Sequence, residues 1–163
     1  MIMKKTTVSL LSIALSFFLS SCGDDHNHKG HEGGHHHEPP HGGVLVELGE
    51  HGTGFNLEVV HDSETGDLGV YVLGGHATNP VRIEAVNIDL SITAEGEQKD
   101  IALSAVANPA FEESVGDTSF FQAKAALPGA DHFEGSVKTV TIKGRTFDNV
   151  SFSYPAKDDN HGH

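Results

Sequence analysis

Hydrophobic and polar residues alternate in short runs along the chain from Gly43 onward. Alternation with a period of two is typical of β-strands that bury one face, and the Gly, Asn and Asp between the runs indicate turns. In one long run, Val86, Ile88, Leu90 and Ile92 are expected to share a face. The pattern predicts eight strands, at residues 44–48, 55–60, 68–73, 81–93, 99–106, 119–125, 137–142 and 147–154.

The spacing of these runs defines the fold class that we expect. The pattern contains no convincing helix, and residues 108–118 have no regular periodicity. Short strands separated by frequent turns are typical of antiparallel architectures. The sequence therefore predicts an all-β fold, either an antiparallel β-sandwich of the Ig-like kind or a small barrel of about eight strands. Residues 55–60 and 68–73 are expected to form a hairpin.

The first residues have the pattern of a bacterial lipoprotein signal peptide. Lys4 and Lys5 precede a short uncharged run, and small residues lead to Cys22, the only cysteine. The run is shorter than the ~20 residues of a membrane span. We expect residues 1–21 to be removed and Cys22 to carry the lipid that anchors the protein to the inner or outer membrane of a bacterial cell envelope. The alternative is an ordinary secretory peptide followed by a stray cysteine.

Histidine is concentrated on both sides of the predicted domain. The chain divides into the signal peptide, a flexible His-rich tether at 22–42 that we expect to be disordered, the β domain at 43–156 and an acidic, His-containing tail at 157–163. Such tracts are a compositional signal for metal binding, and the alternative is a solvated spacer. The candidate ligands in them are His26, His28, His31, His35, His36, His37, His41, His161 and His163.

The residue types limit the metal. Both methionines precede residue 22, and a lipidated Cys22 has no thiol, so the soft ligands that select Cu(I) are missing from the processed chain. Imidazole and carboxylate suit Zn(II), Cu(II) or Ni(II). A flexible tract loses chain entropy when it wraps an ion, so weak binding and fast exchange are expected.

Histidines inside the domain suggest a second, more ordered site. If 55–60 and 68–73 pair, His61 lies near their turn, whereas His51 and His76 fall near the opposite end, within reach of His41. This placement predicts a site of His41, His51 and His76 at one rim. The alternative is that each is a separate polar residue on a surface loop.

Charge and motifs restrict the function classes. The formal net charge is −13, which argues against nucleic acid and anionic lipid as partners and favours cations. No G-x-S-x-G, H-E-x-x-H or phosphate-binding loop occurs, so we do not expect an enzyme.

The segment that opens with Pro40-His41-Gly42-Gly43 resembles a known family. The sequence VLVELGEHGTGFNLEVVHDSETGDLGVYVLGGH follows this opening, and VNIDLSIT comes later. Over about residues 35–106 the chain is similar to the His-rich leader domain ahead of the periplasmic adaptor subunits of heavy-metal efflux pumps. It also resembles free-standing His-rich bacterial lipoproteins.

The resemblance implies a β fold and an association with divalent metal in the envelope, and His41 is the histidine that it shares. The 163 residues show no pattern of the adaptor's coiled-coil hairpin, lipoyl-like and barrel domains, so we do not expect them to bridge a pump by themselves.

Three functional hypotheses follow. The leading one is a metal buffer, or a feeder of metal to a transporter or efflux component. The second is an interaction module that docks an envelope partner, with the His tract as a spacer. A metalloenzyme with a tight site at His51 and His76 is a distant third.

Overall fold

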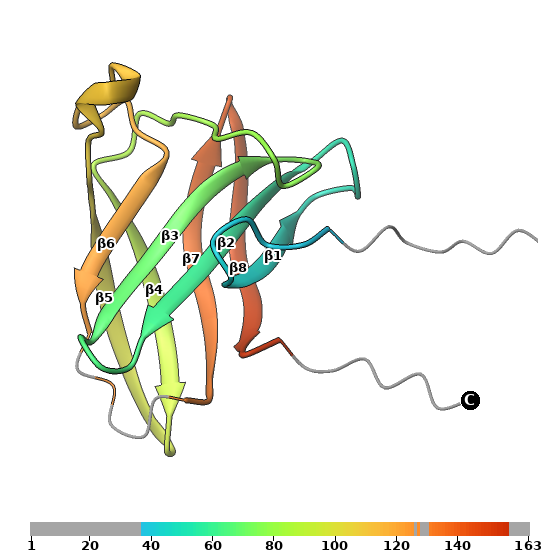
Figure 1. Ribbon diagram of the computed structural model, residues 1–163. Helices are drawn as coiled ribbons and strands as arrows, with labels where there is room; N and C mark the ends of the chain where they lie inside the picture. Colours follow the sequence, from blue (N-terminus) through green and yellow to red (C-terminus); the bar gives the residue numbers. More distant parts are fainter. Residues whose placement is uncertain (1–36, 126, 128–130, 157–163) are drawn as a thin grey trace, which may run out of the picture. The chain divides into compact units, whose positions relative to one another are not determined.

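The computed structural model describes residues 37–125, 127 and 131–156, and the described part of the chain forms eight β-strands (Figure 1). One short 3₁₀ turn, Pro109–Phe111, interrupts the segment before β6. The predicted signal peptide, Cys22, most of the predicted tether and the predicted tail at 157–163 lie outside the described residues. The strands are β1 (Val44–Leu48), β2 (Phe55–Asp62), β3 (Asp67–Gly74), β4 (Asn87–Ala94), β5 (Glu97–Ala105), β6 (Phe120–Lys124), β7 (Phe133–Ile142) and β8 (Arg145–Tyr154).

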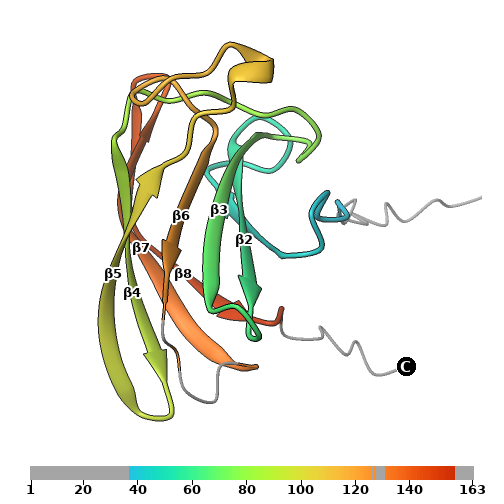
Figure 2. The same cartoon turned by 60° about the vertical axis from the view of Figure 1, so that its left-hand side comes forward.

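All eight strands belong to one antiparallel sheet in the order β1-β2-β3-β6-β5-β4-β7-β8. The sheet curls on itself (Figures 1 and 2). Its two ends, β1 and β8, contact each other, and residues of both strands line a shallow groove. The prediction of an all-β antiparallel fold is confirmed, and the observed arrangement is a nearly closed barrel. No helix in the described part of the chain is long or apolar enough to span a membrane.

Alternation along the strands produces the core. In β4, Ile88, Leu90 and Ile92 are buried, whereas Asn87 and Asp89 between them are exposed. The inward residues of all strands meet inside the curled sheet, so one continuous apolar core holds it together. The large side chains that are fully buried there include Leu57, Leu68, Leu90, Ile92, Leu103, Phe121 and Ile142.

The predicted hairpin of β2 and β3 is confirmed, and Val59 lies opposite Val70 in it. Its turn is stabilised by Asp62, whose carboxylate accepts the backbone N–H of Glu64 at 2.9 Å and of Thr65 at 3.0 Å. Gly66 completes the turn with φ of +73°, a left-handed conformation that favours glycine. His61 therefore lies beside the turn, as expected.

The long strand predicted at 81–93 is wrong in its first half. The chain from residue 81 to 86 crosses between strands, and β4 begins only at Asn87. Single bridges tie this crossing to the sheet, including one between Ile83 and Thr118. Val86 consequently does not share the buried face of Ile88, and 60 % of its surface is exposed.

Candidate functional site

Three histidines meet at one end of the barrel. His51 lies in the turn between β1 and β2, and His76 lies in the turn that follows β3. The ring of His37 stacks on that of His51, with centroids 5.3 Å apart, and meets that of His76 edge-on at 5.4 Å. We call this group the imidazole rim.

Glycines allow the two turns of the rim to approach each other. A Cβ added to Gly75 would lie 2.5 Å from the backbone oxygen of Gly52, closer than side chains tolerate. A Cβ added to Gly52 would lie 3.7 Å from the ring of His76. Close approach of the two backbones therefore requires glycine at 75, whereas glycine at 52 is favoured by its left-handed φ of +76°. Local sequence thus brings His51 and His76 together.

A carboxylate orients one ring of the rim. Nδ1 of His51 lies 2.8 Å from a carboxylate oxygen of Glu47, and both side chains are about half exposed. Proteins commonly hold metal-ligating histidines in this way, because a partner on one ring nitrogen fixes the orientation of the other. Nε2 of His51 is thus left for a ligand. Nε2 of His37 is buried without a hydrogen-bond partner.

The spacing of the rings suits a shared ion. Two imidazoles on one tetrahedral zinc, with Zn–N of about 2.0–2.1 Å, place their ring centroids about 5 Å apart. The observed separations of 5.3 and 5.4 Å are close to this value. Within the described residues, no three His, Cys, Asp or Glu side chains already have the arrangement of a metal site. Binding at the rim therefore requires rotation of the imidazole rings.

The expected grouping of His41 with His51 and His76 is not found, because His41 lies elsewhere. Glu58, on β2, is completely buried under the segment 37–43. One of its oxygens accepts the backbone N–H of His41 at 2.7 Å and of Gly43 at 3.0 Å, and Nδ1 of His41 lies 2.6 Å from the other. We call this arrangement the Glu58 anchor.

The Glu58 anchor explains the Pro-His-Gly-Gly sequence in physical terms. The backbone N–H of Gly42 bonds to the carbonyl of Pro39 and forms a turn. A Cβ on Gly43 would lie 2.2 Å from the carbonyl oxygen of Val59, so only glycine allows the segment to pack this closely on β2. The anchor attaches residues 37–43 to the outer face of the sheet, which places His37 at the rim and His41 away from it.

The remaining histidines of the domain lie apart from the rim. His61 packs edge-on against Phe133 and Tyr154. Burial lowers the pKa of His61 below its ordinary value, even though Asp62 and Asp131 act in the opposite direction. His132 is exposed. The other predicted ligands, His26, His28, His31, His35, His36, His161 and His163, lie outside the described residues.

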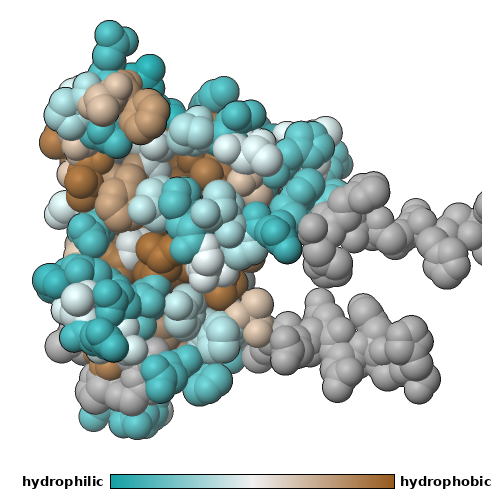
Figure 3. All heavy atoms as spheres, viewed as in Figure 1, coloured by the Kyte–Doolittle hydropathy of each residue, from teal (hydrophilic) through white to brown (hydrophobic). Residues whose placement is uncertain are grey.

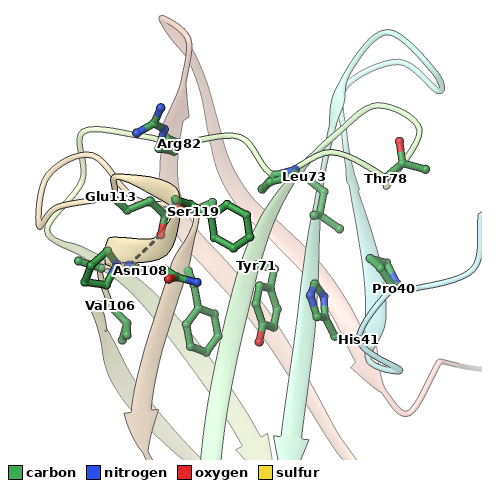
Figure 4. A pocket seen from close by; sticks show the side chains of 15 residues that line it. Pro40, His41, Tyr71, Leu73, Thr78, Arg82, Val106, Asn108, Glu113 and Ser119 are labelled. Carbon is green, nitrogen blue, oxygen red and sulfur yellow. Dashed lines mark hydrogen bonds between the residues drawn. The ribbon is translucent and has the colours of Figure 1, made fainter.

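A large groove is present on the outer face of the sheet, and the sequence did not predict it (Figure 4). Its volume is about 800 Å³. Rings line its floor in a row: His41 stacks on Tyr71 with centroids 3.7 Å apart, and Tyr71 stacks on Phe120 at 4.2 Å. Gly69 makes room for the row, because a Cβ there would lie 2.8 Å from the ring of Phe120.

Charged groups at the groove are engaged by their neighbours. The carboxylate of Glu113 accepts hydrogen bonds from Asn108, Thr118 and Ser119. The guanidinium of Arg82 donates to Asp117 and to the carbonyl of Glu112, both at 3.2 Å. Burial raises the pKa of the Tyr71 hydroxyl, and the nearby charge of Glu58 raises it further. This hydroxyl is thus neutral and able to donate a hydrogen bond.

The sequence of β3 does indicate that the outer face of this strand is covered. The β3 sequence Leu68–Leu73 contains apolar residues at outward positions as well as inward ones, notably Tyr71 and Leu73. A strand that is apolar on both faces is usually covered on both. The pattern indicates a covered outer face, but it does not identify Glu58 as the residue that binds the covering segment.

Comparison of the chain with protein-family models, with curated proteins and with solved structures gave no match. The resemblance to the leader domain of efflux adaptors therefore stays an expectation, and function is argued from the geometry described above.

Proposed function

We propose that this protein is an envelope lipoprotein that binds Zn(II), Cu(II) or Ni(II) and buffers the metal or feeds it to a transporter or efflux component. The meeting of His37, His51 and His76 at the imidazole rim is the observation that carries the proposal. The rim is the ordered site, and the remaining histidines of the predicted tether and tail contribute additional, weaker binding. Cys22 carries the lipid that holds the protein at the membrane.

The chemistry of the rim supports exchange of metal more than permanent storage. Imidazole nitrogens bind these ions only when they are unprotonated, so acidification releases the metal. The rim rings are held by turns and one half-exposed carboxylate, and they must rotate to meet an ion. Each of these features favours release. None of the described residues at the rim forms a nucleophile–base pair, so we propose no reaction there.

A calorimetric titration of the full chain with each metal tests the proposal. The reference variant replaces His26, His28, His31, His35, His36, His161 and His163 by asparagine, so that the rim is the main remaining site. We expect this variant to bind one ion, and we expect His51→Ala and His76→Ala to abolish that binding. His132→Ala is the matched control, because His132 is exposed and distant in the fold from the rim.

The orienting carboxylate gives a second, finer measurement. Glu47→Gln is expected to weaken binding about 10–100-fold, which is the usual effect of removing the partner of a ligating histidine. Absorption of bound Co(II) reports the coordination in each variant. If the reference variant binds no ion, or binds it equally well without His51 and His76, the rim is not a metal site.

The groove supports a second candidate function, an interaction module. This alternative does not require metal, and the exposed apolar lining of the groove is the observation that supports it.

A further inference from the structure

The groove exposes apolar surface that no described residue covers. Phe111, at the tip of the 3₁₀ turn, is 71 % exposed, and Val106 beside it is 38 % exposed, although both line the groove. Apolar side chains interrupt the hydrophilic surface on the face that carries β3 and β6 (Figure 3). The groove volume of about 800 Å³ lies in the usual range of ligand sites, roughly 300–1,000 Å³. Concave, partly apolar sites of this size are where proteins usually bind ligands.

The row of rings determines which apolar groups fit. Tyr71 lies between His41 and Phe120, so both faces of its ring are covered. Figure 4 shows the rings of Tyr71 and His41 standing side by side on the sheet. A flat ligand cannot stack on the covered faces, whereas ring edges and the furrows between them accept compact side chains such as proline and leucine. Pro40, Pro80 and Pro109 also line the groove.

Polar groups at the groove match an unpaired peptide backbone. The side-chain oxygen of Asn108 accepts the N–H of Ala110, which leaves its NH₂ group to donate. The neutral hydroxyl of Tyr71 is a second donor. The backbone of β3 under the groove is paired with β2 and β6, so a ligand cannot join it as an added strand. A polyproline II segment has no internal hydrogen bonds, and its carbonyls need such donors.

Charge around the groove favours a basic ligand. Arg82 is already engaged by Asp117 and by the backbone of Glu112. Glu84 and Glu112 are exposed and lie within two residues of Arg82 and Phe111, which line the groove, and the whole chain carries −13. Carboxylates beside an apolar groove attract Lys and Arg side chains.

We infer that the groove binds an extended, proline-containing peptide segment in which apolar residues are flanked by Lys or Arg. The partner is another protein of the same compartment that exposes such a segment. This site is separate from the imidazole rim, and it does not need metal.

Fluorescence anisotropy with the full chain tests the inference, with EDTA present to remove metal. The probe is a fluorescein-labelled peptide KPLPPLPK, and its acidic counterpart is EPLPPLPE. Phe111→Ser should weaken binding about tenfold or more, because a well-buried Phe side chain contributes that much to affinity. Phe111 is so exposed that its replacement leaves the fold intact, which circular dichroism verifies.

Charge reversal beside the groove provides a matched pair of variants. Glu112 and Glu95 are both exposed and both have left-handed backbones, with φ of 57° and 49°, but Glu95 lies in the turn between β4 and β5. Glu112→Lys should weaken binding of the basic peptide several-fold, and Glu95→Lys should leave it unchanged. The difference should shrink as salt is raised.

Several results would overturn the inference. They are absence of binding by the basic peptide, equal binding of the acidic one, or full binding by the Phe111→Ser variant. Equal effects of the two charge reversals would also contradict it, since they would indicate attraction to the overall charge alone. Binding of neutral phosphatidylcholine vesicles in place of the peptide would identify the groove as a lipid surface.

Discussion

Replacing Glu58 by glutamine is expected to lower the free energy of unfolding by about 2–4 kcal/mol. The substitution keeps the size and shape of the side chain but removes the charge on which three N–H groups converge. Glutamine can place its oxygen on the two backbone N–H groups, but these hydrogen bonds then go to a neutral acceptor and become weaker. Its NH₂ group faces Nδ1 of His41, so the imidazole must adopt the tautomer in which Nδ1 accepts a hydrogen bond.

The magnitude follows from the kinds of bond involved. A hydrogen bond to a charged group contributes about 1.5–3 kcal/mol, and a buried donor left unpaired costs about 1–3 kcal/mol. Two of the donors belong to the backbone of His41 and Gly43, so mutation cannot remove them together with the acceptor. Glu58→Leu is thus expected to lower the free energy of unfolding more than Glu58→Gln. Apolar replacement is often tolerated when both partners of a buried ion pair are replaced, but here the backbone donors remain.

Urea unfolding of the full chain measures this effect. Glu47→Gln on β1 is the matched control, because Glu47 also contacts a histidine at 2.8 Å but is 54 % exposed. Exposed pairs contribute about 0–1 kcal/mol, so the control should remain close to the parent protein. A loss below about 1 kcal/mol for Glu58→Gln, or equal losses for the two variants, would refute our account of the Glu58 anchor.

Three further predictions concern glycine and pH. Thermal unfolding should show a larger loss of stability for Gly43→Ala than for Gly42→Ala. A Cβ at 43 would lie 2.2 Å from a backbone oxygen, whereas a Cβ at 42 would meet open space and only the φ of +75° would be strained. Burial lowers the pKa of His61, so the folded state favours the neutral imidazole. The free energy of unfolding should therefore decrease as the pH falls from 6.5 through the folded-state pKa. In urea titrations at several pH values, this decrease should be smaller for His61→Gln. Burial raises the pKa of Glu113, but hydrogen bonds from Ser119, Asn108 and Thr118 together bring it below its usual value. The contribution of Glu113 to the free energy of unfolding should therefore be complete above pH 4.5 and should be lost as the pH falls below that value. Acid unfolding followed by circular dichroism should be less steep in Glu113→Gln.

Strand positions could be predicted from sequence because burial on one face imposes a period of two. This held for β2, β3 and β8, whose centres match the predicted runs. It failed at residues 81–86, where the same alternation places Val81 and Ile83 inside without a strand around them. Periodicity reports which side chains are buried, and a crossing segment held by single bridges buries alternate residues as a strand does.

The functional sites were harder to predict, because they depend on contacts between distant segments. The hairpin of β2 and β3 correctly brought His51 and His76 to one end and His61 to the other. Which tether histidine joins them depends on how residues 37–43 attach to the sheet. That attachment relies on Glu58, an outward position in a strand, where a polar residue ordinarily indicates contact with solvent.

The strand order has a consequence for how this protein folds. Strands that follow each other closely in the chain pair in β1–β2, β2–β3, β4–β5 and β7–β8. The pairings of β3 with β6 and of β4 with β7 instead join residues far apart in the chain, such as Val70 and Phe121. Loop closure must precede these pairings, so refolding is expected in milliseconds to seconds, as for other antiparallel barrels, and not in microseconds. Until β6 inserts between β3 and β5, the edges of both strands stay open, and a second chain can pair with them. Refolding yield should consequently fall as protein concentration rises.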